Sequence, residues 1–132
     1  MEENQRPNTP INESILYSIK KLLGITYDDT NFDTDIIINI NNVFTVLRQL
    51  GVGPVDGYRI TDESDTWSDF IQNEALLDSV KTYVYLKVKM DFDPPLNSSL
   101  MESFERHMRE IEWRLNVAVE SEPSMSGGNN NE

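Results

Sequence analysis

Residues 98–119 read SSLMESFERHMREIEWRLNVAV, and this stretch decides the fold class. Large apolar side chains and one alanine recur in it at alternating spacings of three and four residues: Met101, Phe104, Met108, Ile111, Leu115 and Ala118. We call these residues the seam. The spacing places them along one side of an α-helix, as in helices that pack against another helix. The stretch therefore predicts a long amphipathic helix and an all-α fold.

The opposite side of this predicted helix carries charged residues in a regular order. Each of three glutamates precedes an arginine by four residues, in the pairs Glu102–Arg106, Glu105–Arg109 and Glu110–Arg114. Such pairs stabilise a helix by about 0.2 to 0.5 kcal/mol each, and we expect this side to face water or a polar partner. Trp113 falls between the seam and the charged side. It is a candidate interaction residue that a neighbouring subunit could cover, and the alternative is an ordinary half-buried side chain.

Three further helices are predicted on the N-terminal side, over residues 12–23, 33–50 and 74–92. Each has apolar residues at helical spacing, and the middle one has the stripe Ile36, Ile40, Val43, Leu47 and Leu50. Gly24 and Gly51 stand where C-capping glycines belong. Asp93-Pro94-Pro95 ends the third, because proline lacks an N–H donor and disfavours helix at the residue before it. We expect the Asp33 carboxylate to cap the second helix.

The segment between the second and third helices, residues 52–64, breaks the helical pattern with Gly53-Pro54 and Asp56-Gly57. It predicts a long loop with at most a short strand or β-hairpin, followed by a short helical turn. Loops of this length in a small domain are typically functional or disordered. We name Tyr58 and Ile60 as candidate anchors for a partner. The alternative is that both side chains cap the core of their own domain.

The predicted architecture is a small helical bundle of about four main helices with flexible termini. Residues 1–11 form an N-terminal extension, residues 12–119 the helical domain, and residues 120–132 a polar tail rich in Asn, Gly and Ser. The tail is too polar to bury a core. Its one large apolar side chain, Met125, is a further candidate interaction residue.

Charge is the most unusual feature of the composition. The 132 residues include 23 acidic and 11 basic side chains, for a net charge of −12. Most of the excess lies in residues 28–35, 56–78 and 120–132. Two interpretations of this excess are open: the acidic loops are simply solvated, or they form a surface that repels polyanions. An open nucleic-acid-binding face is disfavoured, because such faces are basic.

The sequence offers little for catalysis or metal binding. It has no cysteine and a single histidine, His107, which excludes thiolate and histidine-rich sites. The acidic cluster Asp62, Glu63, Asp65 and Asp69 lacks the glycine and final glutamate of an EF-hand loop. We predict no catalytic, cofactor-binding or metal-binding residues. We also expect no membrane span and no signal peptide, and hence synthesis in the cytosol.

The order of segments resembles the head-tail connector (adaptor, or head completion) proteins of tailed bacteriophages. SIKKLLGI (18–25), FDTDII (32–37) and LGVGP (50–54) are similar to the N-terminal half of that family. VKTYVYLK (80–87), FDPP (92–95) and EWRLN (112–116) are similar to its C-terminal half. The Asp-Pro-Pro break between two long helices is the most specific element.

The resemblance implies a structural virion protein without catalytic residues. Its subunits would form a homo-oligomeric ring of about a dozen copies below the portal protein. The ring would extend the DNA channel without binding DNA specifically and would dock a stopper or tail completion protein. It implies assembly in the host cytoplasm and a final location at the head-tail interface. The candidate channel-facing acids are Asp56, Asp62, Glu63 and Asp65.

One alternative from a different functional class is an acidic DNA mimic that inhibits a nucleic-acid enzyme. Such a protein would array its acids along one helix face. Here the predicted helix over 98–119 balances its glutamates with arginines, and the acidic excess lies in the connections. The sequence therefore favours the connector.

Overall fold

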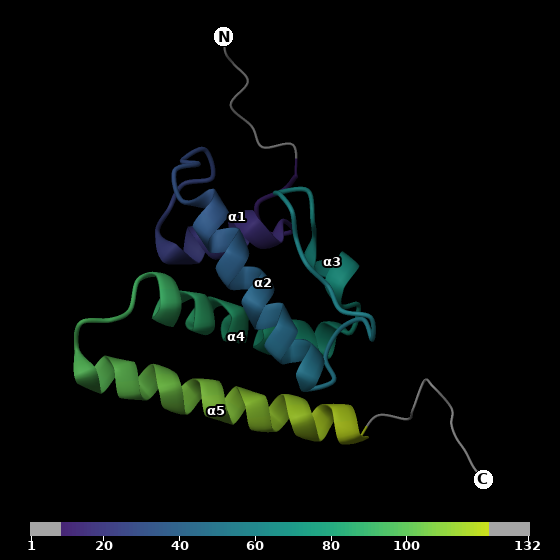
Figure 1. Cartoon of the computed structure of the whole chain (residues 1–132). Helices are drawn as coiled ribbons and strands as arrows, with labels where there is room; N and C mark the ends of the chain where they lie inside the picture. Colours follow the sequence, from purple (N-terminus) through teal and green to yellow (C-terminus); the bar gives the residue numbers. More distant parts are fainter. Residues whose placement is uncertain (1–8, 122–132) are drawn as a thin grey trace.

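A computed structural model of the chain describes residues 9–121 (Figure 1). These residues form the helices α1 (Ile15–Leu23), α2 (Asp33–Gln49), α3 (Trp67–Phe70), α4 (Glu74–Phe92) and α5 (Ser98–Ser121). The prediction of a small all-α bundle with four main helices is confirmed. No strand forms within the described range, so the segment 52–64 is a loop rather than a hairpin. An isolated bridge joins Ser14 to Thr66.

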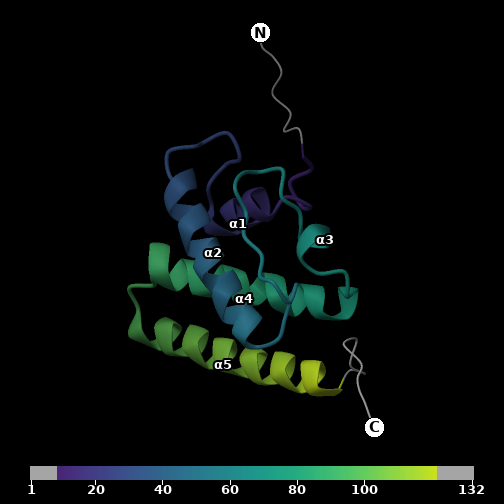
Figure 2. The same cartoon turned by 45° about the vertical axis from the view of Figure 1, so that its right-hand side comes forward.

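Helix α4 is the centre of the bundle and packs against α1, α2 and α5. Figures 1 and 2 show α5 running antiparallel to α4 along one side, while α2 crosses α4 on the other side. The reversal between α4 and α5 follows from the proline pair, because Pro94 and Pro95 cannot continue the helix. Pro95 is itself buried in this turn.

The core is built from the apolar stripes of the helices. The stripe predicted for α2 is buried at Ile36, Ile40, Val43 and Leu47, and α4 contributes Val80, Tyr83, Val84, Leu86 and Val88. From the seam of α5, Met108, Ile111 and Leu115 are buried, and Phe104 packs against the core while half-buried. The helical spacing thus predicted the packing faces, and the middle of the seam is buried more deeply than its ends.

The helix ends correct two details of the sequence prediction. Helix α1 begins at Ile15 instead of residue 12, because the hydroxyl of Ser14 accepts a hydrogen bond from the Tyr17 N–H at 3.1 Å and caps it. The predicted cap of α2 by Asp33 was wrong. Asp33 is the first residue of that helix, and its carboxylate pairs with Lys20. Gly24 follows α1 in the left-handed region with φ 84°, as predicted.

The depth of the seam predicts how alanine substitutions affect stability. Ile111 is 1% exposed, so Ile111→Ala is expected to lower the free energy of unfolding by about 2 to 5 kcal/mol, through lost burial and a residual cavity. Phe104→Ala is expected to lower the free energy of unfolding by less, since Phe104 is only half-buried. Chemical denaturation followed by circular dichroism measures both. Near-zero effects at both positions would mean that α5 does not pack through the seam.

Candidate interaction surfaces

The loop between α2 and α3 is held to the bundle at its middle. The side chain of Asn41 bonds both backbone groups of Ile60: its Oδ1 accepts from the Ile60 N–H at 2.7 Å, and its Nδ2 donates to the Ile60 carbonyl at 3.0 Å. The Arg48 Nε donates to the Val55 carbonyl at 3.0 Å. Gly53 has φ 93°, and a Cβ there would run into the Phe70 ring. The loop therefore has a defined course over α2.

The candidate anchors in this loop pack inside their own chain. Ile60 is fully buried in the core. Tyr58 is half-buried, with its ring centroid 5.4 Å from those of both Phe44 and Phe70. The structure thus supports the alternative in which both residues cap their own core. The exposed apolar side chain of the loop is Val55, which is 85% exposed.

Burial of Tyr58 predicts a dependence of stability on alkaline pH. Burial raises its pKa from 10.0 to about 12, and the charges of Asp65 and Asp69 add to the shift. The phenol therefore stays protonated in the folded chain at a pH where the unfolded chain has lost the proton. Stability should hold below pH 10 and fall as the pH rises toward 12.

Urea denaturation across this range tests the prediction, with Tyr58→Phe as the comparison. Burial and the hydrogen bond to Glu112 also raise the pKa of Tyr83, so the Phe variant should retain part of the alkaline loss. An identical pH profile in the two proteins would contradict the role of Tyr58.

The acids proposed to face a channel lie in or beside the same loop. Asp56 and Asp62 are exposed, and Glu63 and Asp65 are half-buried. Asp62 accepts hydrogen bonds from the backbone and the hydroxyl of Ser64, and these bonds lower its pKa. The Asp65 carboxylate accepts from the Thr61 N–H at 2.7 Å. Two of these acids therefore shape the loop as well as carrying charge.

The outer side of α5 carries the most exposed aromatic side chain of the described residues, and it corrects one expectation, because Trp113 lies among the charged side chains rather than between them and the seam. Trp113 is 68% exposed, and Val117, one turn later, is 39% exposed. Around Trp113 lie the exposed side chains of Arg106, Arg109, Glu110 and Arg114. No ion pair within 4.0 Å joins these charged side chains to one another or to other described residues, so the arginines are available to a partner. We call these five residues, Trp113 and its four charged neighbours, the Trp113 patch.

A second exposed apolar surface lies where the start of α2 meets the end of α4. Phe32 and Phe92 pack edge to face with centroids 5.5 Å apart, and Phe32 is 43% exposed. Ile38 is 54% exposed on α2. With Asp35, Asn39 and Asp91 these residues line a shallow groove, which we call the Phe32 groove. Sequence reasoning missed it because its two phenylalanines are far apart in the chain.

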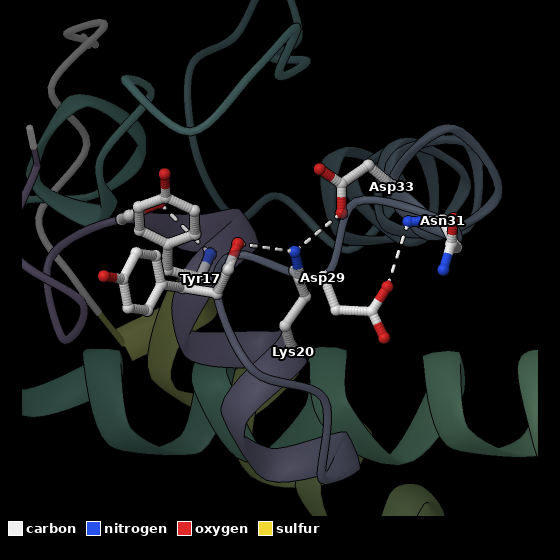
Figure 3. Close-up of polar contacts among 7 residues, drawn as sticks. Tyr17, Lys20, Asp29, Asn31 and Asp33 are labelled. Carbon is white, nitrogen blue, oxygen red and sulfur yellow. Dashed lines mark hydrogen bonds and ion pairs between the residues drawn. The ribbon is translucent and has the colours of Figure 1, made fainter. Parts of the chain in front are cut away.

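A buried lysine fixes the connection between α1 and α2 (Figure 3). Lys20 is fully buried, and its ammonium lies 2.8 Å from Asp33 Oδ1 and donates to the Tyr27 carbonyl at 3.0 Å. The ammonium also lies 5.9 Å from the centroid of the Tyr17 ring. In the same connection Asp29 accepts a hydrogen bond from the Asn31 N–H at 3.2 Å. This cluster is structural, and it orients the start of α2, beside which Phe32 lies.

Other features add no site. Within residues 9–121 no three acidic or histidine side chains gather closely enough to hold a metal ion. None of the helices in that range is long and apolar enough to cross a membrane. Met125, the candidate in the polar tail, lies outside the described residues.

Comparison with known proteins identifies the family. The model of the phage connector protein family matches residues 15–122, which include all five helices. The chain belongs to the phage connector protein family. Connectors are structural proteins of the virion that associate with other head and tail proteins, so the role of this connector is to join head and tail. No curated protein and no solved structure matches the chain.

Proposed function

We propose that this connector forms an oligomeric ring below the portal, extends the DNA channel and docks the next head-completion or tail protein. The observation that carries the proposal is the family match over residues 15–122. The same match favours this role over the alternative of an acidic DNA mimic. We expect the ring to contain about a dozen subunits, as the resemblance to head-tail connectors implies.

The charge of the chain supports a conduit. A wall that carries net negative charge repels the phosphates of passing DNA and offers no basic footprint for binding. With a net charge of −12, the subunit suits such a wall. We propose that Asp56, Asp62, Glu63 and Asp65 face the channel. Asp56 and Asp62 are the stronger pair, because their side chains are exposed.

Assembly contacts are proposed to come in part from the irregular segments. A ring subunit must reach two neighbours as well as partners above and below, and a small bundle has little surface for all of them. The loop 52–64 and the termini extend that reach. Because Ile60 and Tyr58 pack in their own core, the exposed Val55 replaces them as the apolar contact of the loop.

Two variants test these segments in a phage whose own connector gene is disabled. Val55→Asp and a truncation after Glu120 should both leave thermal unfolding unchanged and reduce the yield of completed heads by at least about tenfold. Deleting residues 53–63 is a poor test, since it removes the buried Ile60 and should unfold the chain. Normal yields of infectious particles with both variants would show that helix faces alone make the contacts.

The proposed role has a direct genetic test. Particles assembled without this chain should be DNA-filled heads that lack tails, and supplying the wild-type chain should restore tailed particles. Tailed, infectious particles formed without the chain would overturn the proposal.

A further inference from the structure

The Trp113 patch concentrates positive charge in an acidic chain. Three of the chain's six arginines, Arg106, Arg109 and Arg114, lie in it with one acid, Glu110, so the patch itself carries a net positive charge, while Glu102 and Glu105 lie one turn before Arg106 and Arg109 outside the patch. At its centre Trp113 leaves most of its side chain in water. Burying a tryptophan provides a large apolar contact area. Tryptophan and arginine are enriched among the few interface residues that contribute most to the binding free energy.

The Phe32 groove has the complementary composition. Its apolar lining residues are Phe32, Ile38 and Phe92, and its polar ones are Asn39 and the two acids Asp35 and Asp91, both exposed. The groove therefore combines apolar side chains with negative charge. The Trp113 patch combines an apolar side chain with positive charge.

One chain cannot bring the two surfaces together. The Phe32 groove lies between α2 and the end of α4, whereas Trp113 lies on the exposed side of α5, away from the seam. Figures 1 and 2 show α5 lying along α4. The seam of α5 packs against the bundle, so the opposite side of α5 faces outward. A contact between the two surfaces must therefore join two molecules.

We propose that Trp113 of one subunit packs into the Phe32 groove of the next copy of this chain, with the arginines of the patch against Asp35 and Asp91. Such a contact uses two different surfaces of each molecule, which is the arrangement that propagates around a ring. Each copy carries a net charge of −12, so two copies repel one another. Contact surfaces of opposite local charge reduce this repulsion where the copies meet. The inference rests on the proposed ring and adds the surfaces that close it.

The absence of native cysteine allows a clean cross-linking test. Full-length chains with Val117→Cys, one turn from Trp113, and with Asn39→Cys, in the lining of the Phe32 groove, are mixed at high protein concentration and oxidised, so that Trp113 and Ile38 stay in place. The expected product is a dimer of the two different variants, and a chain with both substitutions should give a ladder of larger products. Leu22→Cys is the control for the groove cysteine, since Leu22 lies on α1 outside the groove and is 53% exposed, more than the half-buried Asn39.

A second measurement does not depend on cysteine geometry. Sedimentation should show that Trp113→Ala and Ile38→Ala each weaken self-association by about 30-fold or more, while Leu22→Ala has little effect. Reversing Arg106, Arg109 and Arg114 to Glu should also weaken it. Mixing that variant with one that carries Asp35→Arg and Asp91→Arg should restore a heterodimer through the exchanged charges.

The outcomes separate this inference from the proposed function. Equal cross-linking of Val117→Cys to Asn39→Cys and to Leu22→Cys would overturn the proposed contact, as would a chain that stays monomeric up to its solubility limit. Either result leaves the connector role to be judged by the particles, because tailless heads without the chain support that role whichever surfaces meet.

Discussion

Replacing Asp33 by alanine is expected to lower the free energy of unfolding by about 3 to 5 kcal/mol. Lys20 is fully buried, and Asp33 supplies the negative charge 2.8 Å from its ammonium. Without that carboxylate the ammonium keeps the Tyr27 carbonyl but has no charge partner. Removing one member of a buried pair costs far more than the pair contributes, because the remaining charge stays desolvated.

Two variants identify the cause of this loss. Asp35→Ala removes an exposed carboxylate from the same first turn of α2, so it should cost less than about 1 kcal/mol through the helix dipole alone. Lys20→Met combined with Asp33→Ala removes both charges and should recover most of the stability. Denaturant unfolding measures all three proteins. If the double variant is no more stable than Asp33→Ala, the unpaired ammonium is not the cause.

Phe44→Ala is expected to lower the free energy of unfolding by about 3 to 5 kcal/mol. It should also loosen the loop 52–64. Phe44 is 1% exposed, stacks on Phe70 with centroids 4.5 Å apart, and meets Tyr58 edge to face. Its removal leaves a cavity beneath the loop. Phe32→Ala is the control, since Phe32 is 43% exposed and should cost much less.

Hydrogen exchange distinguishes local loosening from global instability. The Ile60 N–H, bonded to Asn41 Oδ1 at 2.7 Å, reports on the loop. In Phe44→Ala it should exchange by local opening, so that its protection falls below that of amides in α4. Protection equal to that of α4 would mean that the loop opens only when the whole chain unfolds.

Helix positions and packing faces could be predicted because they depend on local periodicity. The seam residues Ile111 and Leu115 are buried as their spacing indicates, and the Asp-Pro-Pro break separates α4 from α5. These signals lie within one helix or its ends. They carry no information on which helices meet, and that arrangement required the structure.

The features that the sequence did not predict come from contacts between distant segments. Lys20 lies in the last turn of α1, and its burial depends on Asp33 and the Tyr27 carbonyl, which contact its ammonium from outside that helix. Ile60 lies in a polar segment, and its burial and its bonds to Asn41 of α2 show that the loop returns to the core. Trp113 was identified from its helical position, whereas the Phe32 groove depends on residues of two helices.

Cryo-electron microscopy of tailed particles tests the central claim most directly, namely that this chain is the ring-forming connector between head and tail. The predicted result is a ring of density immediately below the portal, into which α2 and the antiparallel pair α4 and α5 fit in every subunit. A head-tail vertex whose density accommodates none of these helices, in particles that propagate normally, would contradict the claim.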